Sequence, residues 1–295
     1  MELVNCNLCG QNTAQPFKSL PDRYSGETFQ LVQCNKCDLI YLSPRPTAAE
    51  IAHYYPAQYE PHTTTETAVD QWRMQQVRQK QLAFVHQYHP QPGYLMDIGC
   101  ATGEFLRTAR ENNWRVSGIE MVAEAAQVAR DEHGLDVSVG AAEDLLTEAA
   151  GFDVITLWDV LEHLANPRAV LEKCQTALRP GGFLILAIPN LDSYERYLFG
   201  SAWLGWEVPR HLYFFTPQTL ERLLDDTGFA LRDASTLTGG RGVFSISLET
   251  AVAGKAWAPL VKKLMPLLLA GLWPYRQFSY WRQKSSIITY VAQKL

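Results

Sequence analysis

The stretch Tyr94–Gly103, which reads YLMDIGCATG, decides the fold. Its first half, Tyr94–Ile98, is a short apolar run, and its second half is a loop that contains Gly99 and Gly103. Glu104–Asn112 follows with apolar residues at helical spacing, so the order is strand, glycine loop, helix. Glycine lets the backbone approach a ligand closely, and the first turn of a helix presents free N–H groups. The stretch therefore predicts a ligand-binding loop beyond the carboxyl end of a strand.

Apolar segments that alternate with helical segments extend this pattern along the chain. Residues 122–133 and 160–178 are predicted helices, and a further helix begins at Pro217, capped by Thr216. Strands that alternate with helices, several of them apolar throughout, imply a parallel sheet covered on both faces. We therefore expect an α/β fold with a doubly wound, mostly parallel, seven-stranded sheet. Its predicted strands are residues 94–98, 114–120, 135–139, 152–158, 183–188, 230–236 and 287–292.

Carboxylates stand at the ends of the predicted strands. Asp97 opens the glycine loop, Glu120 ends the second strand 23 residues later, and Asp144 follows the third. A carboxylate at the position of Glu120 can accept hydrogen bonds from both hydroxyls of a ribose, and Asp144 could accept one from an adenine amino group. The spacing differs from the Gly-x-Gly-x-x-Gly fingerprint that admits a pyrophosphate, and Asp97 would repel that group but attract an ammonium or a sulfonium. The charges therefore favour S-adenosylmethionine over NAD as the cofactor.

At these residues the chain resembles class I S-adenosylmethionine-dependent methyltransferases. Asp97–Gly103 is similar to their first motif, although Ala101 stands where glycine is commoner, and Glu120 resembles their ribose-binding acid. Glu143-Asp144 resembles their adenine-side pair, and Trp158–His163 is similar to the segment after strand four in the branch that includes ubiquinone-biosynthesis methyltransferases. The resemblance implies a Rossmann-like sheet and S-adenosylmethionine as cofactor. The cofactor-binding residues expected on these grounds are Asp97, Gly99, Cys100, Gly103, Glu120, Met121, Glu143, Asp144, Trp158 and Asp159.

Four of the six cysteines form two Cys-x-x-Cys turns near the N-terminus. Two such turns supply the four soft ligands that zinc prefers in a tetrahedron. Residues 29–33 and 39–42 read as short strands between and after the turns, which is the layout of a zinc ribbon. Two disulfides or a redox dithiol are the alternatives, and a cytoplasmic setting and the duplicated motif disfavour them. Four thiolates leave no open position for a substrate, so we predict a structural zinc ion. Its expected ligands are Cys6, Cys9, Cys34 and Cys37.

A zinc ribbon fused to such a domain resembles the sugar C-methyltransferases that act on nucleotide-linked keto-deoxysugars. Tyr54, Tyr55 and Tyr59 are similar to the tyrosine-bearing segment of that group, and Glu207–Phe215 is similar to the segment that holds its proton-abstracting His. The resemblance implies that His211 is the catalytic base. The chain departs from that group just before this His, where Pro-Arg stands in place of an acidic residue.

His163 is the second catalytic candidate, because it lies one turn into the predicted helix after the fourth strand, near the cofactor side. A His with a pKa near neutrality is a suitable base for removing a substrate proton. Aromatic residues gather in residues 191–215 and predict a pocket for a sugar or another ring. A lid that packs on the domain without touching a ligand is the alternative.

We expect three parts in the chain: a zinc ribbon at residues 1–46, a linker and helical lid at 47–93, and the methyltransferase domain at 94–295. An aromatic insertion (191–215) and an apolar helical insertion (237–285) interrupt the domain. The second insertion combines Leu and Trp with Lys and Arg, which is the composition of an interfacial helix. It could equally form a dimer face or cover the substrate site. We favour burial within the protein or in a dimer over peripheral contact with a membrane.

The composition limits the class of protein. Of 295 residues, 47% are hydrophobic, and 26 Lys and Arg are set against 31 Asp and Glu, a formal charge of −5. Such a balance argues against binding to nucleic acid through bulk charge. With no signal peptide and no apolar stretch long enough to span a bilayer, we expect a soluble, cytoplasmic protein.

The sequence thus predicts an S-adenosylmethionine-dependent methyltransferase. We expect it to act, as a monomer or homodimer, on a small-molecule substrate: a sugar, a glycan precursor or a similar metabolite. The alternatives are a zinc-ribbon rRNA methyltransferase, an NAD-dependent oxidoreductase and a non-catalytic zinc-ribbon adaptor.

Overall fold

The computed structural model describes residues 1–55, 68–146, 151–237 and 241–295. The chain divides into two compact units, which we describe separately. The sheet unit consists of Tyr55–Ala187, Glu221–Asp233 and Tyr290–Leu295. The ribbon unit consists of Met1–Tyr54, Ile188–Leu220 and Ala234–Thr289. Residues 56–67 of the predicted linker, which include Tyr59, lie outside the described residues.

A seven-stranded sheet has the order β10-β11-β8-β7-β4-β5-β6. Its central strands are parallel: β4 pairs with β5 and with β7, β5 with β6, and β7 with β8. The chain enters this sheet at the internal strand β4, continues outward through β5 and β6, and then returns to add β7 and β8 on the other side of β4. The predicted doubly wound α/β sheet is therefore confirmed. The strands are β4 (Tyr94–Ile98), β5 (Arg115–Glu120), β6 (Val137–Val139), β7 (Phe152–Trp158), β8 (Leu178–Pro189), β10 (Phe229–Ser235) and β11 (Ile287–Lys294).

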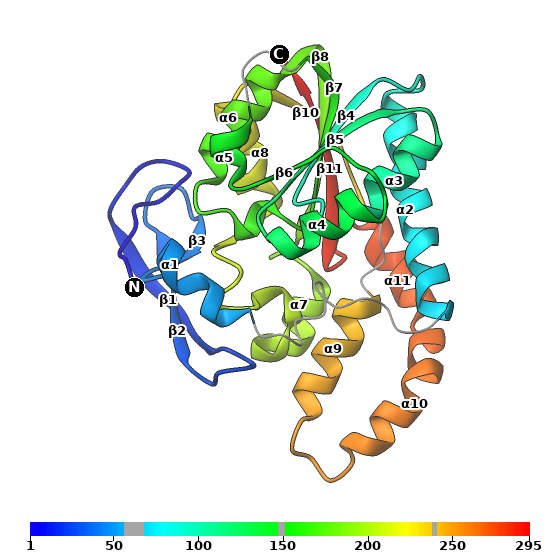
Figure 1. The fold of residues 1–295 in the computed structure, drawn as a ribbon. Coiled ribbons are helices and arrows are strands. Elements are labelled where there is room, and N and C mark those ends of the chain that lie inside the picture. The colour runs from blue at the N-terminus through cyan, green and yellow to red at the C-terminus, as the bar shows by residue number, and fades with distance from the viewer. Residues whose placement is uncertain (56–67, 147–150, 238–240) are drawn as a thin grey trace. The chain divides into compact units, whose positions relative to one another are not determined.

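Amphipathic helices cover the sheet. Figure 1 shows α2 and α3 on one face of the sheet and α6 on the other. On α3 the buried side chains include Phe105, Leu106 and Ala109, whose spacing of one, three and four residues forms one helical face. These helices are α2 (Ala68–Tyr88), α3 (Glu104–Glu111), α4 (Ala123–Asp131), α5 (Ala142–Leu145), α6 (Pro167–Ala177) and α8 (Pro217–Asp226).

The helix predicted over residues 160–178 is wrong in its first part. Leu161–His163 forms a single 3-10 turn, η3, and α6 begins only at Pro167. Asn166 caps α6 by accepting a hydrogen bond from the Ala169 amide at 3.2 Å. Proline has no N–H to donate and disfavours a helical residue before it, so the helix cannot extend back through this point.

The ribbon unit contains an antiparallel sheet in the order β1-β2-β3-β9. The sequence predicted β2 (Thr28–Cys34) and β3 (Ile40–Leu42) but missed β1 (Ala14–Pro21), which contains two prolines and is mostly exposed. The fourth strand, β9 (Tyr213–Phe214), comes from the aromatic insertion and pairs Tyr213 with Tyr41. Hydrogen bonding therefore joins the ribbon to a segment of chain some 170 residues away.

Two short elements follow the ribbon. Thr47 caps α1 (Ala48–Ile51) in a capping box with Glu50, and η1 (Ala52–Tyr54) continues the chain. Within the aromatic insertion, α7 (Tyr194–Phe199) leads into the 3-10 turns η4 (Gly200–Ala202) and η5 (Leu204–Trp206). Trp203 and Trp206 are buried, with their rings edge to face at 5.4 Å.

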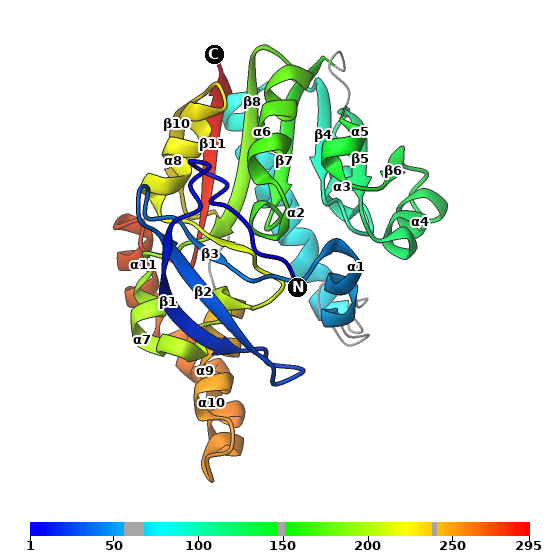
Figure 2. The same cartoon turned by 90° about the vertical axis from the view of Figure 1, so that its left-hand side faces the viewer.

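The apolar helical insertion forms three helices: α9 (Arg241–Val252), α10 (Ala258–Gly271) and α11 (Trp273–Trp281). Figures 1 and 2 both show α9 and α10 side by side, joined by a turn. Among the residues of α10 Met265 alone is buried, so the expected burial within the protein is wrong for this helix, and burial in a dimer stays a prediction. None of the helices that the structure describes is long and apolar enough to cross a membrane.

Candidate functional site

The loop after β4 needs its glycines for two reasons. Gly99 and Gly103 have φ angles of +72° and +82°, in the left-handed region that glycine adopts without strain. A Cβ on Gly99 would lie 2.5 Å from Cγ2 of Val160, and one on Gly103 would lie 2.4 Å from Cδ1 of Leu135. Any larger residue would displace the loop. The Gly99 amide donates to the Ile119 carbonyl at 2.7 Å, which ties the loop to β5.

Two buried carboxyl groups flank this loop. Asp97, near the end of β4, accepts a hydrogen bond from the Thr156 hydroxyl at 2.6 Å. Burial raises the pKa of Asp97 to about 7, although the Thr156 hydrogen bond and the Arg78 guanidinium act in the opposite direction. Glu120, the last residue of β5, accepts from the amides of Ala101 and Val122, both at 2.8 Å. Its position is therefore set by the backbone on both sides.

Arg78 of α2 is a candidate ligand-binding residue that the sequence did not lead us to expect. Its Nη1 donates to Oε1 of Gln81 at 3.1 Å, while its Nε is buried and has no hydrogen-bond partner among the described residues. Burial lowers the pKa of Arg78, and the carboxylates of Asp97, Asp159 and Glu104 oppose that shift. A half-buried guanidinium whose Nε is buried and unbonded, beside carboxylates, fits a site for a ligand that carries both charges.

A signal for Arg78 was present in the sequence. Leu82 and Val85 are buried, and Arg78 precedes them by four and seven residues. Those spacings place all three side chains on one face of the helix. A basic residue in line with the buried residues of a polar helix is unusual enough to mark a functional candidate.

The aromatic end of β7 lies near the same loop. The Trp158 ring meets the Phe105 ring edge to face at 5.5 Å, which places it over the start of α3. Its Nε1 is buried without a hydrogen-bond partner in the part of the chain that the structure describes. Asp159 follows with a φ of +57° and is exposed. A buried donor left unpaired is costly, so Trp158 also fits a site completed by a ligand.

The remaining predicted cofactor residues differ in their surroundings. Glu143 is half-buried and Asp144 is exposed, both on α5, and Met121 is exposed after β5. Cys100 is buried, and a Cβ on Gly118 would lie 2.7 Å from its Sγ. Burial raises the pKa of the Cys100 thiol, so this side chain fills space beside β5 as an uncharged group.

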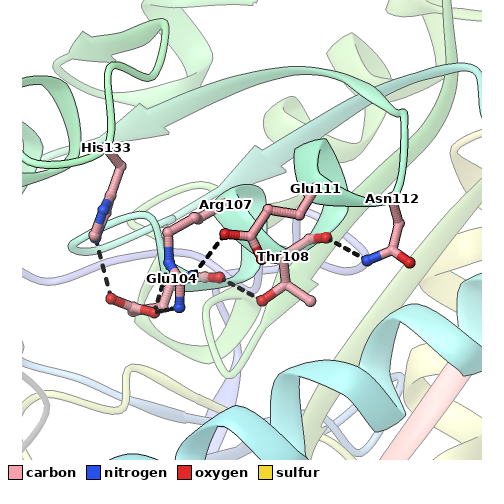
Figure 3. A network of polar contacts seen from close by, with 6 residues as sticks. All are labelled: Glu104, Arg107, Thr108, Glu111, Asn112 and His133. Atoms are coloured by element: carbon pink, nitrogen blue, oxygen red, sulfur yellow. Dashed lines mark hydrogen bonds and ion pairs between the residues drawn. The ribbon is translucent and has the colours of Figure 1, made fainter.

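A polar network fixes the helix that follows the loop (Figure 3). Glu104 bonds both Arg107, at 2.8 Å, and Nε2 of His133, at 3.1 Å. Arg107 also bonds Glu111 at 2.8 Å, and Thr108 donates to the Glu104 carbonyl. Because His133 lies after α4, the network holds α3 against the segment that leads to β6. It anchors the scaffold of the loop and leaves the loop amides free of these side chains.

The two catalytic candidates lie in different units. His163 belongs to η3 of the sheet unit, and its Nδ1 is 3.4 Å from the Tyr55 hydroxyl. His211 is buried in the ribbon unit, where its Nδ1 is 2.9 Å from the Gly205 carbonyl and its Nε2 is 3.7 Å from Glu207. Burial lowers the pKa of His211 to about 4, so the imidazole is neutral at neutral pH. Donation from Nδ1 to Gly205 leaves Nε2 as the proton acceptor.

Arg210, directly before His211, has a structural role. Its fully buried guanidinium donates to Asp22 of the ribbon at 2.7 Å and to the Tyr54 carbonyl at 2.7 Å. Arg210 thus holds the His211 segment to the ribbon, which is a structural use of the position where the chain departs from the sugar C-methyltransferases.

The four ribbon cysteines come together as predicted. Their Sγ atoms all lie within 4.8 Å of one another, with Cys6 and Cys37 at 3.4 Å and Cys9 and Cys34 at 3.5 Å. These separations fit four thiolates around one zinc ion, because Zn–S bonds of about 2.3 Å in a tetrahedron place the sulfurs about 3.8 Å apart. All four are free cysteines, so the two-disulfide alternative is wrong for this structure.

Comparison with known proteins identifies the fold and the family. A family described as a methyltransferase domain matches residues 70–234, more than half of the chain. The chain belongs to this methyltransferase family. The class I S-adenosylmethionine-dependent methyltransferase predicted from the glycine loop is confirmed, and so is its Rossmann-like sheet.

Relatives and solved structures add detail. The ubiquinone biosynthesis O-methyltransferase of Xanthomonas axonopodis pv. citri is 31% identical over 158 residues, 50% of this chain and 66% of that protein. The enzyme of the same name from Cupriavidus pinatubonensis is 30% identical over 173 residues, 54% of this chain and 69% of that one. The chain thus spans about two thirds of the length of these relatives. The crystal structure of the cyclase SpnF superimposes with a TM-score of 0.52 and 20% identity, over 85% of this chain and 98% of that one. This likeness shows the fold alone.

Proposed function

We propose that the chain binds S-adenosylmethionine at the glycine loop and transfers its methyl group to a small molecule. The observation that carries the proposal is the pair of buried carboxyl groups, Asp97 and Glu120, at the ends of β4 and β5 beside Gly99. When bound, S-adenosylmethionine supplies a methyl group already activated on a sulfonium sulfur. The residues of the chain therefore need only bind, orient and remove a proton.

Each part of the site has a proposed role. Asp97 attracts the positive charge of the cofactor. Burial raises the pKa of its carboxyl to about 7, and a cation bound nearby would lower that pKa and so favour the ionised form. Glu120 accepts from the ribose hydroxyls through the lone pairs that the Ala101 and Val122 amides do not use. Arg78 pairs with the carboxylate of the methionine part, and Trp158 lies along the adenine.

The proposed acceptor is a hydroxyl oxygen on a small molecule such as a sugar, a glycan precursor or a similar metabolite. The names of the matched relatives support transfer to oxygen on a small molecule. The resemblance of the ribbon-plus-domain arrangement to sugar C-methyltransferases supports a sugar-like skeleton. The acceptor oxygen would form a bond to the methyl carbon as the carbon–sulfur bond breaks, and the hydroxyl proton would leave to a base.

His211 is the proposed base, with His163 as the second candidate. The neutral imidazole of His211 offers Nε2 as a proton acceptor, but a pKa of about 4 makes it a weak one until a substrate or a charge raises that value. His211→Gln should lower kcat at least tenfold while the Kd for S-adenosylmethionine stays within about twofold. An unchanged kcat would remove His211 from the mechanism, and the same measurement on His163→Gln would then test the second candidate.

Zinc is the proposed metal of the four-cysteine cluster. Without a cation, burial raises the pKa of Cys6 to about 11 and also raises the pKa of Cys37, so these two thiols need the charge of a metal to become thiolates. The metal would cross-link both turns of a ribbon that has a small core of its own. Metal analysis of the purified chain should find one zinc per chain, and Cys9→Ala should lose it. A folded chain without any metal would contradict this proposal.

One experiment tests the methyltransferase proposal itself. Isothermal titration should show binding of S-adenosylmethionine, and a screen of labelled methyl transfer should compare phenolic compounds, nucleotide sugars and ribosomal RNA. Transfer to a small hydroxylated compound is the expected result. Transfer to RNA, or tight binding of NADH with no binding of S-adenosylmethionine, would favour one of the alternative enzymes.

A further inference from the structure

An apolar face of α10 and α11 is exposed to solvent. Along α10, Trp257, Leu260, Leu264 and Leu267 recur at intervals of three and four residues, so their side chains form one stripe. Leu267 is 71% exposed, although a leucine in this fold is usually buried. We call the exposed apolar residues of this region the arm face. It consists of Trp257, Leu260, Leu264, Leu267, Leu268, Trp273, Phe278 and Trp281.

The charged residues of the segment that carries the arm face all have one sign, although one of them, Lys284, forms an ion pair with Asp192. No acidic residue occurs after Glu249, whereas residues 250–285 contain six basic ones. The first 249 residues carry a formal charge of −12, so the charge of the chain is strongly divided. Lys262 and Lys263 are exposed on α10. At helical spacing Lys263 flanks the apolar stripe, whereas Lys262 lies on the opposite side of the helix. The basic residues of the segment are Lys255, Lys262, Lys263, Arg276, Arg282 and Lys284.

A second copy of the chain is a poor occupant for this face. Two copies that met through it would bring together two segments with six basic residues each and no acidic one, and only Lys284 has an ion pair within its own chain among those the structure records for these residues. An anionic lipid surface matches both features, because its acyl boundary accepts Leu and Trp while its headgroups attract Lys and Arg. Tryptophan in particular is enriched at the membrane–water interface.

We propose that α10 and α11 dock the protein on an anionic membrane surface. The arm face enters the boundary between headgroups and acyl chains, and the flanking lysines and arginines contact lipid phosphates. The helices lie on the surface, since none that the structure describes can span a bilayer. This inference depends only on α10 and α11, and it holds whatever the substrate of the methyltransferase site is.

The test is co-sedimentation of the full chain with lipid vesicles. The protein should pellet with vesicles of phosphatidylcholine mixed with phosphatidylglycerol, should remain in the supernatant with phosphatidylcholine alone, and should be released by salt. The double variant Lys262→Glu/Lys263→Glu removes the charge contribution, and Leu267→Asp/Trp281→Asp removes the apolar one. Each should lower the fraction bound to anionic vesicles at least tenfold.

Two control substitutions keep the test specific. Lys80→Glu on α2 and Arg222→Glu on α8 also reverse exposed basic residues of helices, and both should leave vesicle binding unchanged. All altered side chains are exposed, so melting followed by circular dichroism should show each variant folded. Absence of binding to anionic vesicles, or equal binding by the arm variants and the controls, would overturn the proposal. So would light scattering that shows a dimer which the arm variants dissociate, because the arm face would then be an interface between copies.

Discussion

The glycine loop after β4 and the arm face depart in opposite ways from the usual distribution of charged and apolar side chains between surface and interior. At the loop, Asp97 is only 3% exposed and Glu120 only 8%. On the arm, Leu267 is 71% exposed and Trp281 is 75% exposed. Folded proteins usually expose charged groups and bury large apolar ones, so both regions are candidates for a functional role. We propose a different partner for each: a cationic ligand at the loop and an apolar, anionic surface at the arm face.

The difference between the two regions lies in how the structure compensates for the departure. The buried carboxylates are supported by backbone amides, by Thr156 and by the positive charge of Arg78, so the site is organised before a ligand arrives. The arm has no comparable support, because the exposed leucines contact solvent. A pre-organised polar site selects one ligand, whereas an apolar stripe selects a kind of surface.

The largest contrast should appear in stability. Leu171 on α6 is fully buried, whereas Leu267 on α10 is exposed. Leu171→Ala should destabilise the protein by about 2–5 kcal/mol, because it removes buried contacts and leaves a cavity. Leu267→Ala should change the free energy of unfolding by less than about 0.5 kcal/mol. Urea denaturation of both variants measures the two values, and a large effect of Leu267→Ala would mean that the arm is covered in solution.

The next largest effect concerns the buried end of β5. Glu120→Ala should weaken binding of S-adenosylmethionine at least 100-fold, about 2.7 kcal/mol, because it removes a ribose acceptor and frees the Ala101 and Val122 amides. Isothermal titration gives the affinity. Glu111→Ala, which removes an exposed carboxylate from α3, is the matched control and should bind normally. Equal affinity in both variants would show that Glu120 is not at the cofactor site.

The buried carboxyl of Asp97 predicts a pH dependence. In the free protein its pKa is raised to about 7, so the group is largely protonated below neutrality, and a bound cation should lower that pKa. Binding then releases a proton below pH 7, and the affinity should increase with pH by up to about tenfold per unit in that range. Titration calorimetry in two buffers of different ionisation enthalpy measures the released proton. Asp97→Asn should bind weakly at every pH; if it kept the pH dependence, another group would be responsible.

The smallest effect concerns Ala101 in the loop. Its φ of +49° lies in the left-handed region, which disfavours a residue with a Cβ by roughly 1–2 kcal/mol. Glycine relieves that strain but gives the unfolded chain more freedom, so Ala101→Gly should stabilise the protein by no more than about 1 kcal/mol. Thermal unfolding measures the change. Val122→Gly, at an ordinary backbone conformation, should destabilise instead, and stabilisation by both would mean that strain is not the cause.

Much of the sheet and the cofactor loop could be predicted from residues close together in the sequence. The apolar run before Gly99, the spacing from Asp97 to Glu120 and the two Cys-x-x-Cys turns are local patterns, and they led to the fold, the family and the cysteine cluster. The stop of the helix before Pro167 was also readable from the sequence and was overlooked. The sequence alone therefore determined that this is an S-adenosylmethionine-dependent methyltransferase with a four-cysteine ribbon.

Only the tertiary structure decided which distant segments meet and which find no partner. Pairing of β9 with β3, the burial of Arg210 against Asp22 and the placing of Arg78 among carboxylates all join residues far apart in the chain. The exposure of Leu267 and Trp281 is likewise a property of the packing, because an apolar stripe looks the same in a sequence whether or not a surface covers it. The physical reason is that burial and electrostatic environment depend on three-dimensional neighbours, whereas helix spacing, glycine turns and ligand motifs depend on adjacent residues.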